Sequence, residues 1–589
     1  MSKRRRITVI LAAATLALLL AGCAEWFQRE KPTTRPAGTL ATDNPARQLE
    51  YGAILQGTIA EYTYIENFAP LRVRGYGLVT GLGGHGSRNC PPSVREQIVK
   101  EIRRLRAGTP QRQLDLPSAE SVIDSLDTAV VQVEGQVPAG AAKNRSFDVF
   151  VRALDPDTRS IAGGVLQTCD LRIFTDQGPA GSIEGRVWAQ ARGPVFFNPF
   201  AGGPAGNGPT STHIDFREGV IIGGGANVLP RTLNLVTIVD SYGIVRQIRD
   251  AINRRFPTDE PVADATSPSH VQLTIPRAYH EREARFIEIV RHLPLVSEPA
   301  VQEARTRFLT SELVRPEAPL NEVALCLEGI GRSTLPLLQP HYTHPRPQVN
   351  YYAARTGLRL GDGLALDVLI EHARNPDSPF RRQAIAELGE SDKKLAAAAT
   401  LRKLLNDEDP RIGIEAYEAL RRSDPDSIWQ VVVGSNPANF LLEMTPSEGE
   451  PLIYARRTGT RRIALIGGDR MVCRPPLLYA DQDKPVLVSA RQGDPSITIM
   501  RRDRNGNIVL GPIQGPLDVP PLIRMLGQEL RTNHEGKFKG LNLDYAAVLD
   551  VLYELARNDA INARFRWEEP SVEDIAGPLT SPGRPESEL

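Results

Sequence analysis

The hydrophobic pattern of this chain changes twice along its length, and each change restricts the fold that can form there. Over residues 49–300, short segments of alternating apolar and polar residues are interrupted by segments with helical spacing. Val271 and Leu273 alternate with polar neighbours as in a strand, whereas Ile244 and Ile248 share one face of a helix. Strands and helices mixed in this way predict an α+β domain over residues 49–300.

Residues 315–428 carry a different pattern, in which apolar residues recur with helical spacing and prolines mark the helix starts. Proline is tolerated in the first turn of a helix, where its missing N–H is not needed. The spacings of 28, 32 and 31 residues between these prolines predict a short HEAT-like array of helical repeats. Unrelated helices that happen to share prolines are the alternative. The four prolines are Pro319, Pro347, Pro379 and Pro410.

The pattern returns to strand-like alternation after residue 428. We expect a small β-rich module over residues 429–535, with the Asn505-Gly506 pair as a hairpin turn. A helical segment over residues 536–569 is expected to close the fold. The last residues, 570–589, are rich in Pro, Ser and Glu and are expected to be disordered. A chain of this length is expected to form about three or four domains.

The N-terminus has the features of an export signal. Basic residues at positions 3–6 precede an apolar run, Ile7–Leu20, which is too short for a comfortable membrane span. The run ends in Leu20-Ala21-Gly22-Cys23, which resembles the lipobox of bacterial lipoproteins. This resemblance implies cleavage of a signal peptide, residues 1–22, and acylation of Cys23. A plain signal peptide with an incidental cysteine is the alternative.

Residues 23–48 are expected to form a flexible tether, because their prolines and polar residues leave no apolar core. Ala24 stands where an aspartate would, by resemblance to the Gram-negative sorting rule, favour retention in the inner membrane. We therefore expect the exported chain to be held by its lipid on the periplasmic side of the outer membrane. Several acyl chains anchor a protein firmly, whereas a single chain holds it only marginally.

Charge and cysteine content exclude several classes of function. The formal net charge is zero and falls to −4 once residues 1–22 are removed, so the chain lacks the basic surface typical of nucleic-acid binding. The four cysteines after Cys23 are far apart in the sequence and form no CxxC zinc motif. Export would permit a Cys90–Cys169 disulfide, although buried free thiols are favoured. These four are Cys90, Cys169, Cys326 and Cys473.

The sequence offers no motif that carries catalytic chemistry. The segment Gly75–Gly81 is one residue too long for the dinucleotide-binding fingerprint, and His341 and His344 form a pair without further metal ligands nearby. No set of nucleophile, base or metal ligands can be assembled from the motifs present. The sequence therefore predicts no enzyme, no cofactor, no bound metal and no small-molecule substrate.

The segment Arg74–Leu82, which reads RGYGLVTGL, resembles a segment near the start of mature flagellar P-ring proteins. Further segments follow in the order of that family, among them VREQIVKEIRRL, GGVLQT, REGVIIGGG and VQLTIP. The resemblance covers about residues 50–295. It implies a structural subunit of the flagellar basal body, which forms a periplasmic ring with copies of itself around the rod, next to rod or L-ring proteins.

The glycine-rich segment then becomes a candidate assembly loop, because glycine allows close backbone approach and positive φ. A tight turn within the domain explains the same glycines equally well. The candidate residues are Gly75, Tyr76, Gly77, Gly81, Gly83 and Gly84.

The chain departs from the family beyond Val296, and the expected helical repeats follow from residue 315. A short echo of the family's C-terminal segments occurs at Arg457–Thr460 and Ile466–Gly468, which would suit a helical insertion into the domain. We therefore expect a lipid-anchored, P-ring-like structural protein. The alternative is an envelope scaffold lipoprotein without a flagellar role, which uses the helical repeats to bind proteins.

Overall fold

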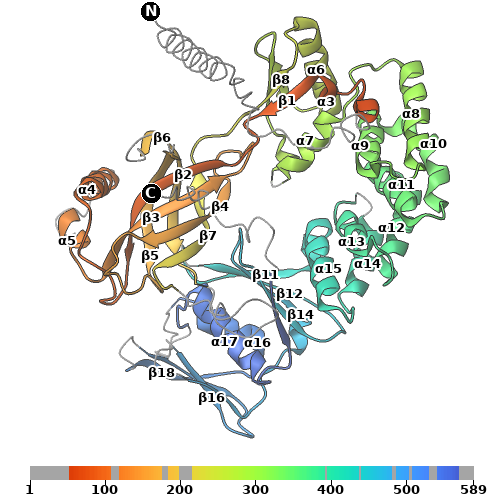
Figure 1. Cartoon of the computed structure of the whole chain (residues 1–589). Helices are drawn as coiled ribbons and strands as arrows, with labels where there is room; N and C mark the ends of the chain where they lie inside the picture. Colours follow the sequence, from red (N-terminus) through yellow and green to blue (C-terminus); the bar gives the residue numbers. More distant parts are fainter. Residues whose placement is uncertain are drawn as a thin grey trace, which may run out of the picture.

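The computed structural model describes most of the chain between residues 52 and 568 (Figure 1). Several predictions concern residues outside this description: the signal peptide, Cys23, the tether, the Asn505-Gly506 turn and the tail. Among the described residues, no helix is both long and apolar enough to cross a membrane. The described ranges are 52–107, 118–174, 183–197, 215–280, 282–391, 394–436, 439–480, 486–502, 507–529 and 540–568.

Six strands form a closed antiparallel barrel in the order β2-β3-β4-β7-β6-β5. Alternate side chains point into the barrel, and Val131, Val133 and Val151 are among those buried there. Helices α4 (Pro92–Ala107) and α5 (Ala119–Ile123) pack against its outside, over β2 and β3. The strands are β2 (Leu71–Thr80), β3 (Thr128–Val137), β4 (Ser146–Ala153), β5 (Val165–Phe174), β6 (Ile183–Pro194) and β7 (Glu218–Asn227).

A four-stranded antiparallel sheet forms a second layer, in the order β1-β8-β10-β9. Because β1 precedes the barrel in the sequence and β8 follows it, the barrel is inserted between two neighbouring strands of this sheet. Helices α6 (Tyr242–Arg255) and α7 (Glu283–Arg291) share one apolar core with the sheet. Ser241 caps α6 by accepting a hydrogen bond from the N–H of Ile244. The other elements are α3 (Ile59–Tyr62), β1 (Thr63–Glu66), β8 (Leu233–Thr237), β9 (Ala263–Ala265), β10 (His270–Leu273) and η1 (Arg277–Tyr279).

Residues 299–423 form a curved array of helices (Figure 1). Pro347 and Pro410 lie in the first turn of their helices, as the sequence predicts, and Pro319 is the N-cap of another. Small buried residues such as Ala384 and Ala416 allow neighbouring helices to pack closely in one core. The elements are α8 (Pro299–Leu313), α9 (Leu320–Ile330), η2 (Arg332–Thr334), α10 (Leu335–Leu338), η3 (Gln339–Thr343), α11 (Pro347–Arg359), α12 (Leu364–Arg374), α13 (Arg381–Gly389), α14 (Lys394–Leu404), α15 (Pro410–Ser423) and η4 (Pro425–Ser427).

The C-terminal module contains two sheets, in the orders β11-β12-β14-β13-β19 and β15-β16-β17-β18. Its two helices share one apolar core with both sheets, so the two segments predicted on either side of residue 535 pack together. The elements are β11 (Trp429–Val433), β12 (Phe440–Thr445), β13 (Leu452–Ala455), β14 (Arg462–Ile466), η5 (Gly468–Arg470), β15 (Leu477–Tyr479), β16 (Val486–Ala490), β17 (Ile497–Arg502), β18 (Ile508–Gly515), α16 (Val519–Gly527), α17 (Tyr545–Arg557) and β19 (Arg564–Trp567).

These parts are arranged one after another along a closed path, so that the last part contacts the first (Figure 1). The barrel leads to the second sheet, the sheet to the helical array, and the array to the C-terminal module. The module then returns to the barrel, because Phe196 and Ile222 belong to the apolar core of the module. The α+β prediction is confirmed, with a helical array and a strand-rich module after the first domain.

Candidate assembly site

The glycines of the predicted assembly loop fall into two groups with different surroundings. Gly75, Tyr76 and Gly77 lie inside β2 and so belong to the barrel wall, which corrects the prediction of a loop at these positions. A Cβ atom on Gly75 would lie 2.2 Å from the backbone oxygen of Asp170, and one on Gly77 would lie 2.8 Å from Cδ1 of Leu166. These two glycines therefore let β2 and β5 approach within one chain and close the barrel.

Gly81, Gly83 and Gly84 form the turn that follows β2, and all three have positive φ, at 81°, 59° and 92°. Glycine is required here for its backbone conformation, since a Cβ on Gly81 or Gly84 would meet no atom within 4 Å. Asp127 holds the turn, because its side chain accepts a hydrogen bond from the N–H of Gly83. These three glycines are exposed at one end of the barrel.

A cavity of about 500 Å³ lies between β2, β5 and the helices α4 and α5. Sequence reasoning missed this cavity, although it identified Tyr76 and Gly77, which line it, and the apolar stripe of α4. We call it the α4 groove. It is lined by Tyr76, Gly77, Leu78, Thr80, Ile98, Glu101, Ile102, Val122, Gln167, Thr168 and Cys169.

Glu101 is the buried acidic group of the α4 groove. It is 8% exposed, and its Oε1 atom has no hydrogen-bond partner among the described residues. Burial, together with the neighbouring Asp170 carboxylate, raises the pKa of the Glu101 carboxyl to about 7. The nearby arginines, Arg104 and Arg172, form ion pairs with Asp170 and not with Glu101. An uncharged Glu101 can exist at neutral pH, but a cation in the groove would favour its charged form.

The C-terminal module is docked onto the barrel by the turn at Arg457–Thr460. The Asp148 carboxylate of β4 accepts hydrogen bonds from the N–H of Gly459, at 3.0 and 3.1 Å, and from the N–H of Gly223, at 2.6 Å. A Cβ on Gly223 would lie 2.3 Å from the carbonyl oxygen of Gly459, so the two backbones meet directly. The sequence pattern singled out Arg457–Thr460, but nothing in it identified Asp148 as the hydrogen-bond acceptor.

The remaining motifs have local structural roles. All four described cysteines are free, so Cys90 and Cys169 are not bridged in this structure. Burial raises the pKa of the Cys169 thiol above its ordinary value. His341 lies within η3 and His344 is its C-cap, and Nδ1 of His344 accepts a hydrogen bond from the N–H of Arg346 at 3.1 Å. No group of three or more His, Cys, Asp or Glu side chains suited to a metal occurs in the described ranges.

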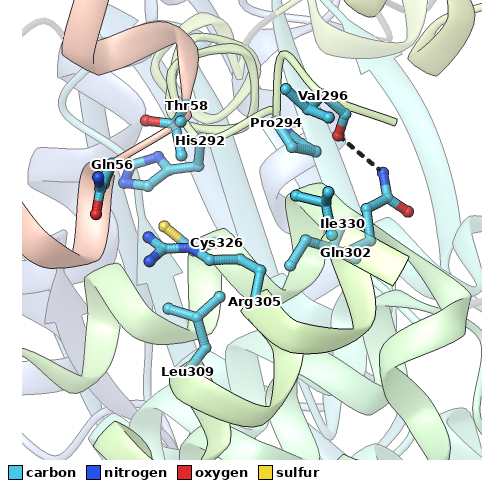
Figure 2. A pocket seen from close by; sticks show the side chains of 12 residues that line it. Gln56, Thr58, His292, Pro294, Val296, Gln302, Arg305, Leu309, Cys326 and Ile330 are labelled. Atoms are coloured by element: carbon cyan, nitrogen blue, oxygen red, sulfur yellow. Dashed lines mark hydrogen bonds between the residues drawn. The ribbon is translucent and has the colours of Figure 1, made fainter. Parts of the chain in front are cut away.

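A smaller cavity, of about 90 Å³, lies where the second sheet meets the helical array (Figure 2). Several of its polar side chains are used within the chain: Arg305 donates to the backbone oxygens of Ala53 and Ile54, and His292 pairs with Glu322 at 2.6 Å. Gln302 donates to the Val296 oxygen at 3.4 Å, as the dashed line shows (Figure 2). These contacts join two parts of the molecule, and the cavity is a packing gap at that junction.

In a comparison with known proteins, one family match covers both the barrel and the second sheet. Residues 58–305 match the flagellar P-ring protein family. The resemblance expected from the sequence is therefore confirmed over this region. A model of HEAT repeats matches residues 366–431, which confirms the repeat prediction for the second half of the array.

Individual relatives support the same assignment. A flagellar P-ring protein of Geobacter metallireducens is 28% identical over 226 residues, which cover 37% of this chain and 56% of the relative. One from Campylobacter lari is 24% identical over 244 residues, covering 40% of this chain and 63% of the relative. One from Thermotoga maritima is 25% identical over 235 residues, covering 37% and 61%. The chain thus spans between about half and two thirds of the length of these P-ring proteins.

Proposed function

We propose that this chain is a structural subunit of the bacterial flagellar basal body. It forms a P-ring-like ring with copies of itself in the periplasm, around the rod, and catalyses no reaction. The family match over residues 58–305 carries this proposal, because it spans both the barrel and the second sheet. Rod or L-ring proteins are the proposed neighbours. The proposed function involves neither nucleic acid nor a small-molecule substrate.

We further propose that acylated Cys23 anchors the chain to the outer membrane. The support is the sequence Leu20-Ala21-Gly22-Cys23 at the end of an apolar run. The 28 residues between Cys23 and residue 52 could span at most about 90 Å when fully extended. A tether of this reach allows the barrel to join a ring at some distance from the lipid surface.

The helical array is the part that the P-ring match leaves largely uncovered, and a chain of buried charges runs through it. Arg285 of α7 pairs with Glu328 of α9, which also lies 3.4 Å from Arg359 of α11. Arg359 in turn pairs with Glu387 of α13 at 2.5 Å. The second sheet and three helices of the array are therefore joined by alternating charges that are largely removed from water. We call these four residues the charge chain. They are Arg285, Glu328, Arg359 and Glu387.

A second cluster of charges joins the last helix of the array to the C-terminal sheet. Arg462 of β14 and Glu443 of β12 are each 1% exposed, and Arg462 also pairs with Glu418 of α15. Tyr417 and Arg421, both of α15, donate hydrogen bonds to Glu443. Buried charges of this kind fix orientation, because each requires its partner at a defined position.

We infer that the array acts as a rigid bridge, which holds the C-terminal module against the barrel. Much of its charge is used for contacts within the chain, as in the pairs of Glu390 with Arg282 and Arg422. A bridge of fixed geometry suits a ring subunit, because a ring closes only when each copy repeats the same rotation.

Deletion of the gene tests the proposed function. The expected result is loss of swimming, with basal bodies that lack the ring around the rod in electron micrographs. Restoration of the intact gene should recover both. Normal swimming with complete rings would contradict the proposal and would favour the alternative, an envelope scaffold whose helical repeats bind other proteins.

A further inference from the structure

The α4 groove combines apolar walls with a buried acid, one of whose oxygens lacks a donor. Leu78, Ile98 and Val122 provide apolar surface, and Gln167 at the rim is exposed to solvent, so the groove opens outward. The Oε1 atom of Glu101 is the buried polar atom without a partner. Leaving a carboxylate oxygen buried without a hydrogen bond is unfavourable, and a cation or an N–H donor entering the groove would remove this cost.

A second surface of the same chain has the opposite character. Ile238 and Val239 are each 66% exposed and Tyr242 is 63% exposed, at the start of α6. Arg246 is one helical turn further along and is therefore on the same face as Tyr242. It is exposed, and the acid one turn further along, Asp250, pairs with Arg249. We call Ile238, Val239, Tyr242 and Arg246 the α6 knob.

The knob is more than a scatter of exposed apolar residues. Single apolar side chains are common on protein surfaces, whereas three large exposed ones within five residues, one of them aromatic, suit a contact with a partner. The backbone holds the group in place, since the N–H of Ile238 donates to the Tyr62 oxygen at 2.9 Å and Ser241 caps the helix. The α6 knob is thus preformed, as an efficient binding surface should be.

We propose that the α6 knob of one copy inserts into the α4 groove of the next copy in the ring. The Arg246 guanidinium donates to the Glu101 carboxylate, while Tyr242 and its apolar neighbours cover the groove walls. The two surfaces lie on separate parts of the molecule (Figure 1), as a head-to-tail contact between identical subunits requires. A basic, apolar knob and an acidic, apolar groove complement each other in charge and polarity. This inference rests on the proposed ring function.

The assembly of the full chain, purified in detergent, tests the contact by analytical ultracentrifugation. Arg246→Glu should raise the concentration needed for half-assembly at least tenfold, and Glu101→Gln should also weaken assembly. The matched control is Arg254→Glu, which makes the same charge change at an exposed position near the other end of α6 and should assemble as the wild type does.

A cysteine crosslink provides a readout that does not depend on Glu101, whose substitution also changes the stability of the chain. Tyr242→Cys combined with Val122→Cys should give covalent dimers and higher oligomers on mild oxidation. Tyr242→Cys combined with Trp429→Cys should not, because Trp429 lies outside the groove. If the wild type assembles but Arg246→Glu assembles equally well and no crosslink forms, this contact is overturned and ring formation stands. If the wild type remained monomeric at every concentration, both the knob–groove contact and the proposed ring would be overturned.

Discussion

Gly75 and Gly77 show how much a single residue determines in this fold. Each lies where β2 faces β5, and the backbone oxygen of Asp170 occupies the space that a side chain on Gly75 would need. Gly81, Gly83 and Gly84 are only a few residues away, yet they are required for positive φ at an exposed turn. The same short segment thus contains glycines for barrel closure and glycines for a surface turn, and only the second group is exposed.

Gly75→Ala should destabilise the barrel by about 2–3 kcal/mol, because the added methyl group forces β2 and β5 apart. The loss can be measured as a lower urea midpoint for the unfolding transition of the barrel. Gly243→Ala serves as the control, since its Cβ would contact only Ser241 Oγ, at 3.6 Å, and its φ is not positive. That variant should be unchanged or slightly more stable. Equal stability of the two variants would contradict the role assigned to Gly75.

Glu101→Gln should stabilise the unassembled chain at pH 8 but have little effect at pH 5. The pKa of Glu101 is raised to about 7 in the folded chain, above its value of about 4.3 in unfolded peptides. Folding therefore becomes less favourable as the pH rises between these two values, by roughly 3.7 kcal/mol at most. Urea unfolding at both pH values checks this, with the exposed Glu96→Gln on the same helix as the control. If Glu101→Gln raised the free energy of unfolding equally at both pH values, the raised pKa of Glu101 would be contradicted.

At the scale of elements, the charge chain determines how the helices of the array meet the second sheet. Burial alone raises the pKa of the Glu328 carboxyl, but Arg285 and Arg359 outweigh burial and hold that pKa below its ordinary value. The contribution of Glu328 to stability is therefore fully present above the unfolded pKa, and it is lost as the pH falls through the lower pKa of the folded chain.

Glu328→Gln should lower the free energy of unfolding of the array by about 3 kcal/mol near neutral pH, because Arg285 and Arg359, both largely removed from water, each lose one carboxylate partner. Far-ultraviolet circular dichroism during urea unfolding provides the measurement. The control is Glu303→Gln, which breaks an exposed pair with Arg307 and should cost less than about 0.5 kcal/mol. If Glu328→Gln lowered the free energy of unfolding as little as Glu303→Gln does, the charge chain would not stabilise the array.

The positions of many helices and strands could be predicted from the sequence. The prolines indicated where helices of the array begin, because a residue without an N–H fits the first helical turn, and the alternation at Val271 and Leu273 indicated β10. The α4 groove could not be predicted, since it depends on how far a helix stands from a barrel. Asp148 and Gly459 are 311 residues apart, and no local pattern marks that pairing.

At the scale of the whole molecule, the chain closes on itself. The barrel, the second sheet, the array and the C-terminal module follow one another (Figure 1). The module returns to the barrel where Gly459 donates to Asp148. A closed arrangement of this kind limits the independent motion of its parts. We infer that the added array and module stiffen the subunit and fix the angle at which its surfaces meet the next copy.

Asp148→Ala should release the C-terminal module from the barrel, because it removes the acceptor for the N–H groups of Gly459 and Gly223. We expect faster hydrogen exchange around Gly459 and Gly223 and a larger radius of gyration in small-angle scattering. The matched control is Asp215→Ala, which removes an exposed barrel carboxylate paired with Arg217. If the two variants had the same dimensions and exchange rates, the module would be held by other contacts.

The central claim is that this chain forms part of a ring around the flagellar rod. Electron cryotomography of flagellar motors in intact cells, with and without the gene, tests this claim most directly. We predict a ring of density around the rod that disappears on deletion and returns with the complementing gene. Averaged motors with the same density in both strains would contradict the claim.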